Sequence, residues 1–187
     1  RGTYPTNHHH HLARKPHGLQ YTDFTITGTQ TLSSDDLSAI TSELIGSCFD
    51  EDSEEIAERV RALFQNRGYF TSVVKSVRIK PIDPIAIPKP VVLEAEVDEG
   101  QRCTLGAIGF VGNHAFGAPE LRNVFPLKKG ALFARDKIAS GLDNLRNLYE
   151  SRGFIDVTFI PDTENVSNAS VILSISVTEG PQYHMGE

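Results

Sequence analysis

The stretch LFQNRGYFTSV at residues 63–73 is followed later in the same chain by a close variant, LYESRGFIDVT at residues 148–158. Each begins in a run whose apolar residues recur at helical spacing, passes through Arg-Gly-aromatic, and continues with residues that favour strands. A glycine at this point predicts a helix that ends in a left-handed turn, with the arginine in its last turn. The repetition therefore predicts two copies of one structural unit.

The run before each glycine predicts an amphipathic helix. Apolar residues at spacings of three and four form one stripe in each copy. They are Ile56, Val60, Leu63 and Phe64 in the first copy, and Ile138, Leu142, Leu145, Leu148 and Tyr149 in the second. A shorter helix is expected earlier in each copy, around residues 32–40, where Ser33 and Asp36 resemble a capping box, and around residues 115–125, where Pro119 suits a first helical turn.

The runs after each glycine alternate with the period of two that is typical of strands. In the first copy Val73, Lys75, Val77 and Ile79 are predicted to share one face, opposite Val74, Ser76 and Arg78. In the second copy Ile155, Val157 and Phe159 are predicted to lie opposite Asp156, Thr158 and Ile160. A last strand follows in each copy, with Val91, Leu93, Ala95 and Val97 on one face, or Val171, Leu173, Ile175 and Val177. One apolar and one polar face indicate a sheet that is covered on one side only.

Short first strands precede the helices, FTITG at residues 24–28 and IGFVG at residues 108–112, and hairpin loops are predicted at residues 81–90 and 161–169. The predicted fold class is therefore α+β. It consists of two tandem β-α-α-β-β units, each a three-stranded mixed sheet covered on one face by two helices.

The expected units span residues 19–100 and residues 101–180. Residues 1–18, which include the run His8–His11 and have no hydrophobic period, are expected to be a disordered leader or a tag remnant. The closing segment TEGPQYHMGE at residues 178–187 keeps the register of DEGQRCTLGAI at residues 98–108. Residues 181–187 are therefore expected to begin a further unit or a linker, in a fragment of a longer protein.

Charge and cysteine content argue against several kinds of site. The net charge is −6 and no basic stripe is present, which argues against nucleic-acid binding. No apolar run reaches the roughly 18 residues that a transmembrane helix needs. The acidic run DEDSEE at residues 50–55 precedes a predicted helix, where negative charge is favourable, and lacks calcium-loop spacing. Cys48 and Cys103 lack zinc-site spacing; free thiols and a mutual pair both stay open.

The chain resembles polypeptide-transport-associated (POTRA) domains. The resemblance rests on the order of elements, on FVGN at residues 110–113, on the Arg-Gly-aromatic turn at residues 152–154 and on VTEG at residues 177–180. It covers about residues 20–187 and is looser in the first unit. It implies the soluble periplasmic arm of an outer-membrane β-barrel protein in a Gram-negative-type envelope.

The resemblance implies a binding scaffold, with no catalytic residue, metal or cofactor. The chain contains no GxSxG, HExxH, P-loop or dinucleotide-binding fingerprint, and His114 and His184 are expected to be isolated surface residues. The implied partners are unfolded outer-membrane or secreted polypeptides, accessory assembly lipoproteins and the protein's own membrane barrel. The alternatives are a two-partner secretion transporter arm, an envelope or cell-division interaction domain and, from a different class, a small hydrolase.

The resemblance places the strand after each Arg-Gly turn at a sheet edge, where a client polypeptide can add as a further strand. The expected binding residues are Val73, Val74, Lys75, Ser76, Val77, Arg78, Ile155, Asp156, Val157, Thr158 and Phe159. The alternative is a pure spacer in which Lys75, Arg78 and Lys80 only protect the edge from aggregation. Gly28, Gly68, Gly112 and Gly153 are expected at structural turns, Tyr69, Phe70 and Phe154 between helix and sheet, and the Glu-Gly junctions in short linkers.

Overall fold

A computed structural model describes residues 19–45, 53–83, 85–86, 89–166 and 169–186. The first unit contains β1 (Leu19–Thr27), α1 (Ser34–Ile45), α2 (Ser53–Gln65), β2 (Val73–Pro81) and β3 (Lys89–Asp98). The second contains β4 (Thr104–Val111), α3 (Ala118–Val124), α4 (Arg135–Ser151), β5 (Thr158–Val166) and β6 (Ser170–Thr178). The predicted leader, the run His8–His11 and Cys48 lie outside the described residues.

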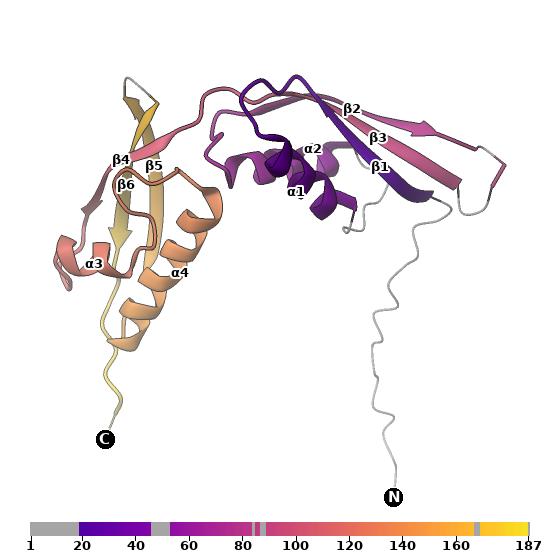
Figure 1. Ribbon diagram of the computed structural model, residues 1–187. Coiled ribbons are helices and arrows are strands. Elements are labelled where there is room, and N and C mark those ends of the chain that lie inside the picture. Colours follow the sequence, from indigo (N-terminus) through magenta and orange to yellow (C-terminus); the bar gives the residue numbers. More distant parts are fainter. Residues whose placement is uncertain (1–18, 46–52, 84, 87–88, 167–168, 187) are drawn as a thin grey trace, which may run out of the picture.

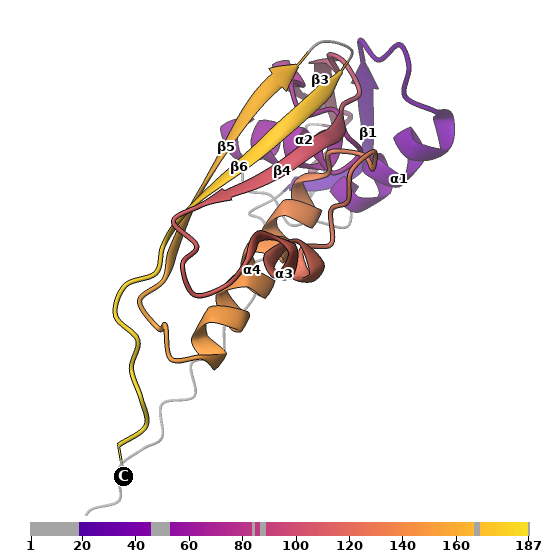
Figure 2. The same ribbon diagram turned by 90° about the vertical axis from the view of Figure 1, so that its left-hand side faces the viewer.

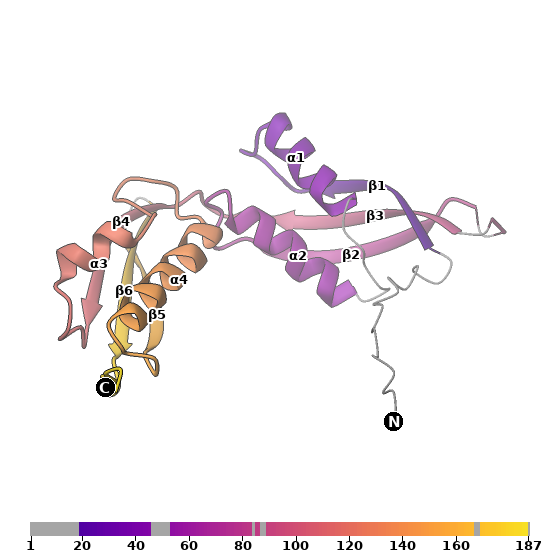
Figure 3. The same cartoon turned by 90° about the horizontal axis from the view of Figure 1, so that it is seen from below.

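The two units share one topology (Figure 1). The sheets have the strand orders β1-β3-β2 and β4-β6-β5, so that the last strand of each unit is central. In each sheet the first strand runs parallel to the central strand and the other runs antiparallel to it. Figure 3 shows α1 and α2 over one face of the first sheet, and Figure 2 shows α3 and α4 on one side of the second. The predicted α+β class, with two tandem β-α-α-β-β units, is confirmed.

Each unit encloses its own hydrophobic core between sheet and helices. The predicted alternation is confirmed in both central strands, since the residues that face the helices are buried: Val91, Leu93, Ala95 and Val97 in β3, and Val171, Leu173, Ile175 and Val177 in β6. The helix stripes pack against these strands from Ile56, Val60, Leu63 and Phe64 in α2 and from Leu145 and Tyr149 in α4. The helix that follows the first strand starts as predicted, because Asp36 N donates to Ser33 Oγ at 3.1 Å.

The predicted alternation is wrong at the start of β2. The register against β3 shifts between Val74 and Ser76, which places Lys75 in a β-bulge. An extra residue in one strand exchanges the faces on which the residues before and after it lie. Val74 and Val77 consequently pack against the core, whereas Val73, predicted on the same face as Val77, is 54% exposed.

The predicted limits of the second edge strand are also wrong. Ile155 and Asp156 are exposed in a turn, and Val157 is buried in the core but precedes the strand, which begins at Thr158. The strand then continues through most of the predicted loop to Val166, paired with β6 residue by residue. Pro161 is tolerated because an edge strand leaves alternate N–H positions facing away from the sheet.

Gly28 and Gly112 end the first strands in a conformation that glycine adopts readily. Their φ angles are 90° and 84°. A Cβ atom would lie 2.3 Å from the Val97 carbonyl oxygen at Gly28 and 2.2 Å from that of Val177 at Gly112. The absence of a side chain therefore lets the chain turn against the end of the central strand, as the sequence predicted for these turns.

We expect Gly112→Ala to lower the free energy of unfolding by about 2–3 kcal/mol, because it combines a left-handed residue with a backbone clash. The matched control is Gly109→Ala in β4, the strand that Gly112 follows, where a Cβ atom meets nothing within 4 Å. That substitution is expected to be neutral or slightly stabilising. Urea denaturation measures both, and equal effects of the two substitutions contradict the assignment.

Candidate functional site: the sheet edges and the junction between units

Four strands lie at sheet edges, β1 and β2 in the first unit and β4 and β5 in the second. An edge strand can bind another strand only where its outward N–H and C=O groups are free. The four edges differ in this respect, and the difference follows from a few side chains.

The β2 edge has free outward donors. Ile82 N donates to Pro90 O at 2.9 Å, so the backbone N–H of Ile82 points toward β3. Since antiparallel pairs alternate, the N–H groups of Ile79 and Val77 point away from β3. Pro81 takes the next outward position and has no N–H. No side chain in the described part of the chain accepts a hydrogen bond from the amide of Val77 or Ile79.

The surroundings of the β2 edge are charged on both sides. Lys75 and Arg78 are exposed, and Lys80 Nζ lies 3.0 Å from Glu94 Oε1 on the neighbouring strand. Beside α2, a pocket of about 300 Å³ is lined by Glu54, Ala57, Glu58, Arg61, Val73 and Val74. A strand added here would therefore place one set of alternate side chains near this pocket and the other near the basic residues.

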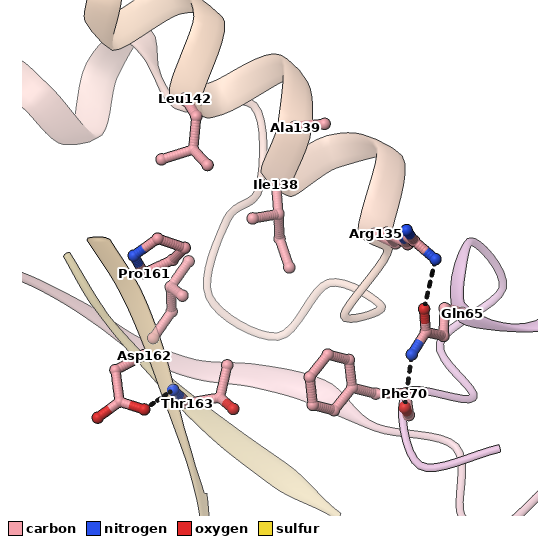
Figure 4. Close-up of a pocket in the computed structure, with 10 residues that line it drawn as sticks. Gln65, Phe70, Arg135, Ile138, Ala139, Leu142, Pro161, Asp162 and Thr163 are labelled. Atoms are coloured by element: carbon pink, nitrogen blue, oxygen red, sulfur yellow. Dashed lines mark hydrogen bonds between the residues drawn. The ribbon is translucent and has the colours of Figure 1, made fainter. Parts of the chain in front are cut away.

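The β5 edge is blocked at its centre (Figure 4). Pro161 has no N–H, and its place in the strand requires that position 161 face away from β6. Thr163 then also faces outward, and its N–H donates to Asp162 Oδ1 at 2.9 Å. Two consecutive outward positions are thus unable to donate to an added strand.

The other two edges are also partly occupied. In β1, Phe24 N donates to the side-chain Oδ1 of Asp23 at 2.8 Å. At the start of β4, Leu105 N donates to Ala131 O at 2.9 Å, and Gly130 N donates to Leu105 O at 2.7 Å. The loop before α4 therefore covers this end of the second sheet.

A set of polar contacts clamps the start of α4 to the first unit. The helix has Ala134 at its N-cap, which supplies no side-chain cap. Asn66, which follows α2, takes this role, because its Oδ1 accepts a hydrogen bond from Asp136 N at 3.0 Å. A side chain of the first unit thus satisfies a backbone donor in the first turn of a helix of the second.

Arg135 is the centre of the same clamp. Its Nη1 donates to Glu58 Oε1 at 3.0 Å and to Gln65 Oε1 at 3.1 Å, and Gln65 Nε2 in turn donates to Phe70 O at 3.0 Å. Phe70 was predicted between helix and sheet of its own unit, but its ring packs edge-on against Phe133 of the second unit, with centroids 5.0 Å apart. Tyr69 and Phe154 are buried in their own cores, as predicted.

A segment leaves each unit after its Glu-Gly pair, and equivalent hydrogen bonds hold the two segments. Cys103 N donates to Gly68 O at 2.8 Å, and Tyr183 N donates to Gly153 O at 2.8 Å. One residue earlier, Arg102 Nε donates to Arg67 O at 3.4 Å, and Gln182 Nε2 donates to Arg152 O at 2.9 Å. The segment after each Glu-Gly pair therefore folds back onto the Arg-Gly turn of the unit that it leaves.

The glutamates of the two Glu-Gly pairs close their own units. Glu99 Oε1 accepts hydrogen bonds from Gln30 N at 2.9 Å, Thr31 N at 2.6 Å and Thr31 Oγ1 at 2.9 Å. Glu179 Oε2 accepts one from Ala115 N at 2.8 Å. Desolvation opposes the charge of Glu99, but the bonds from Thr31 and Gln30 outweigh it and lower the pKa of the carboxyl. The glutamate of each predicted linker is thus bonded to the unit that precedes the linker.

The structure brings together only part of the predicted binding set. Val73, Val74, Lys75, Ser76, Val77 and Arg78 lie on β2, and Thr158 and Phe159 begin β5, but Ile155, Asp156 and Val157 precede that strand. Sequence reasoning missed Asn66, Arg135 and Asp162, because their roles depend on partners distant in the sequence or on the direction of one side chain. In the sequence, Pro161 could have indicated that this edge lacks a hydrogen-bond donor, because proline has no N–H.

Other classes of site find little support among the described residues. These contain no group of three or more His, Cys, Asp or Glu side chains placed to hold a metal ion. None of the described helices has the length and apolar run that crossing a bilayer requires. His114 and His184 are exposed, as predicted, and Cys103 is a buried free thiol.

Residues 104–180 match the family model POTRA, described as a surface antigen variable number repeat. POTRA domains 3–5 of Haemophilus influenzae BamA superpose with a TM-score of 0.65 at 19% identity, over 89% of this chain and 67% of that one. Haemophilus ducreyi BamA lacking POTRA domains 1–3 gives 0.60 at 23% identity, over 86% and 29%. POTRA domains 1–2 of Anabaena Omp85 give 0.50 at 13% identity, over 86% and 95%.

These likenesses confirm the resemblance predicted from the sequence. The family model covers the second unit, where the sequence motifs are strongest. At these identities the superpositions show a shared fold, and they extend it over both units. The chain spans 67% of the first solved structure and 29% of the second.

Replacement of Asn66 by alanine is expected to weaken α4, which lies in the other unit. Loss of a helix cap costs about 1 kcal/mol, and here the loss falls on the first turn of α4. Amide hydrogen exchange of Ile138 and Leu142 measures the effect. The control is Asn147→Ala at an exposed position of α4 itself. Faster exchange confined to α1 and α2 would show that Asn66 does not cap α4.

The hydrogen bonds of Glu99 predict a dependence of stability on pH. Its pKa in the folded state lies below the ordinary value of a glutamate carboxyl. The carboxylate therefore stabilises the fold above that value, and this contribution is lost as the pH falls through the lower, folded pKa. The difference in unfolding free energy between wild type and Glu99→Gln is expected to be largest at pH 7 and to shrink towards pH 3. The exposed Glu96→Gln serves as control, and a difference independent of pH is the contrary result.

Proposed function

Because residues 104–180 match the POTRA family model and both units have the POTRA fold, we propose that this chain is a periplasmic, polypeptide-binding arm of an outer-membrane β-barrel protein. Its clients are unfolded outer-membrane or secreted polypeptides. Its role is that of a scaffold without catalysis.

The observation that carries this proposal is the free edge of β2. Val77 and Ile79 offer outward N–H groups, whereas Pro161 and the Asp162–Thr163 hydrogen bond block the corresponding strand of the second unit. A client segment in extended conformation adds antiparallel or parallel to β2 through backbone hydrogen bonds, which demand little of its sequence. This property suits an arm that handles many different clients.

Side chains beside β2 supply a weak preference among clients. Alternate residues of an added strand lie near the pocket beside Ala57 and Val74, or near Lys75 and Arg78. Small apolar residues on one face and acidic residues on the other are therefore favoured. The same lysine and arginine side chains oppose aggregation when no client is bound.

The second unit has a different role in this proposal. Its blocked β5 edge favours the spacer alternative for this unit, and the clamp at Asn66 and Arg135 holds it at a defined angle to the first. Residues 181–183 leave the unit along the path that residues 101–103 take from the first. We propose that they lead to a further unit or to the membrane barrel.

Two questions about partners belong to the same proposal. Assembly of outer-membrane proteins is the leading role, because the superposition on BamA domains has a TM-score of 0.65. Transport of a secreted partner protein is the alternative, and the same edge would serve it. Accessory lipoproteins are expected on surfaces that leave the β2 edge free.

The experiment removes one outward N–H group from β2. Val77→Pro deletes the donor and leaves the bonds to β3 intact, since position 77 faces outward. We expect it to weaken binding of a fluorescein-labelled peptide of alternating apolar and polar residues by about tenfold or more, measured by fluorescence anisotropy. The matched control is Val77→Ala, which keeps the N–H and is expected to bind within about twofold of wild type.

A second variant tests the blocked edge in the opposite direction. Replacing Pro161 by threonine together with Asp162 by serine restores two outward donors on β5. The double variant is expected to bind a second equivalent of the same peptide. The proposal is contradicted if Val77→Pro folds and binds as wild type does, or if the unmodified protein already binds the peptide at β5.

A further inference from the structure

Each unit ends in an Arg-Gly turn, and within the described part of the chain only the first of these turns is covered by another unit. Two hydrogen bonds of the first unit have counterparts in the second, so that positions of the two units can be matched one by one. They join Tyr69 N to Phe64 O and Arg61 Nε to Ser72 O in the first unit, and Phe154 N to Tyr149 O and Arg146 Nη1 to Val157 O in the second. The residues that clamp the first unit to the second therefore have identifiable counterparts at the end of the second unit.

The counterparts of the clamp residues form a surface that we call the exit face. The clamp residues are Glu58, Gln65, Asn66 and Phe70, and their counterparts on the exit face are, in the same order, Asp143, Glu150, Ser151 and Ile155. In Figure 1 the last turn of α4 and the C-terminal segment lie at the end of the second unit that points away from the first.

The exit face differs from the clamp surface in exposure. Gln65, which bonds to Arg135, is 5% exposed, whereas Glu150 at the same place in the second unit is exposed. Phe70 is half-buried, whereas Ile155 is 58% exposed. The exit face is thus the exposed counterpart of a surface that is buried at the first junction.

The exit face carries two carboxylates. Asp143 and Glu150 lie about two turns apart on α4 and therefore on one side of it. Neither has an ion-pair partner within the part of the chain that the structure describes. In the first unit, the counterparts Glu58 and Gln65 both accept hydrogen bonds from Arg135 Nη1, at 3.0 and 3.1 Å. One guanidinium group can therefore reach both positions, and two carboxylates favour it more strongly than a carboxylate and an amide do.

The other two residues of the exit face match the remaining functions of the clamp. Ile155 presents an apolar side chain at the place where Phe70 packs against Phe133, with ring centroids 5.0 Å apart. The Ser151 hydroxyl donates to a carbonyl of its own helix at 2.6 Å. Its lone pairs stay available to accept a backbone N–H, as Asn66 accepts one from the first turn of α4.

The segment that leaves the second unit is held in the same way as the segment that leads into it. Tyr183 N donates to Gly153 O at 2.8 Å, which is the counterpart of the bond from Cys103 N. The Tyr183 hydroxyl also donates to a carboxylate of the same turn at 3.0 Å. Two positions further on, Leu105 is 1% exposed in the core of its unit, whereas its counterpart Met185 is 99% exposed. Met185 thus supplies the apolar side chain that the first strand of a unit buries.

We propose that the exit face binds a further unit of the same fold, which contributes one arginine or lysine between Asp143 and Glu150 and one apolar or aromatic side chain over Ile155. This inference rests on the proposed function, in which residues 181–183 lead on from the second unit, and it adds the surface and the chemistry of the contact.

The first junction gives the arrangement of the two contributed side chains. Phe133 and Arg135 lie in the loop before α4 and at its first residue, with the aromatic residue first. A short tether keeps such a unit at an effective concentration of about millimolar, so that a few contacts suffice to hold it. The arm is then a stack of units joined by one repeated clamp.

The test extends the full chain by one unit. A second copy of residues 104–186 is joined directly after Tyr183, so that Tyr183 takes the place that Cys103 has before the second unit. The appended copy brings its own Phe133 and Arg135. Residual dipolar couplings measured by NMR report the orientation of each unit, and the first junction of the same molecule is the internal reference. We expect the appended copy to share the alignment tensor of the second unit, because docking suppresses the independent motion that is usual between linked domains.

Charge reversal tests the role of the two carboxylates. Asp143→Lys together with Glu150→Lys is expected to reduce the alignment tensor of the appended copy at least about twofold, because like charges then oppose docking. The matched control is Asp162→Lys together with Glu164→Lys on β5, which changes the net charge equally and should have no effect. Arg135→Glu in the appended copy alone should restore docking to the charge-reversed variant, which separates charge complementarity from a loss of folding.

Any of three results overturns this proposal. The first is independent orientation of the appended copy while the first junction stays rigid, which would favour the end of the membrane barrel as the occupant. The others are no effect of charge reversal on the exit face, and no recovery with Arg135→Glu. Val77→Pro should leave all orientations unchanged, so that a failure here and a failure of peptide binding at β2 are distinguishable.

Discussion

The left-handed turn at Gly68, repeated at Gly153, is the constraint on which the rest of the structure depends. The φ angles are 90° and 89°, and in each copy the next residue closes the helix end, Tyr69 N to Phe64 O at 3.1 Å and Phe154 N to Tyr149 O at 3.0 Å. This closure sends the aromatic ring into the core and the chain toward the edge strand. The glycine carbonyl is left free to accept the N–H of the linker. One turn thus sets the end of the helix, the packing of the core and the exit of the chain.

The two copies have kept this frame and diverged at their edges and ends. In the first unit the edge strand has a bulge at Lys75 and free donors beyond it. In the second, a proline and an aspartate remove the same donors, and the space beside the strand is lined with apolar side chains. The two units therefore share one topology but differ in the chemistry of their edge strands. The β2 edge thus offers outward backbone donors that the centre of the β5 edge lacks.

Much of the fold was predictable from the sequence, because periodicity and glycine positions reflect local structure. The stripes of α2 and α4, the central strands and the turns at Gly28, Gly68, Gly112 and Gly153 all follow from residues close together in the chain. The bulge at Lys75 was not predictable, since it depends on the register against β3. The late start of β5 was missed because Ile155 and Val157 alternate as strand residues do, although Gly153 still directs the chain through a turn at that point.

The site was less predictable than the fold. The family resemblance implied that the strand after each Arg-Gly turn lies at an edge, but the direction in which each N–H points depends on pairing partners. Asn66 looks like an ordinary residue at a helix end, and its role appears only when α4 is placed beside it. Arg135 and Phe70 likewise act on residues of the other unit. Contacts between units have no local pattern in the sequence, whereas contacts within a unit follow its hydrophobic period.

The central claim is that polypeptides add as a further strand to the free edge of β2. Amide hydrogen exchange, followed by NMR in the presence and absence of an extended client peptide, tests it most directly. The account predicts slower exchange of the Val77 and Ile79 amides on binding, with no change at Phe159 or Asn165 in β5. Unchanged exchange at Val77 and Ile79 while the peptide is bound would contradict it.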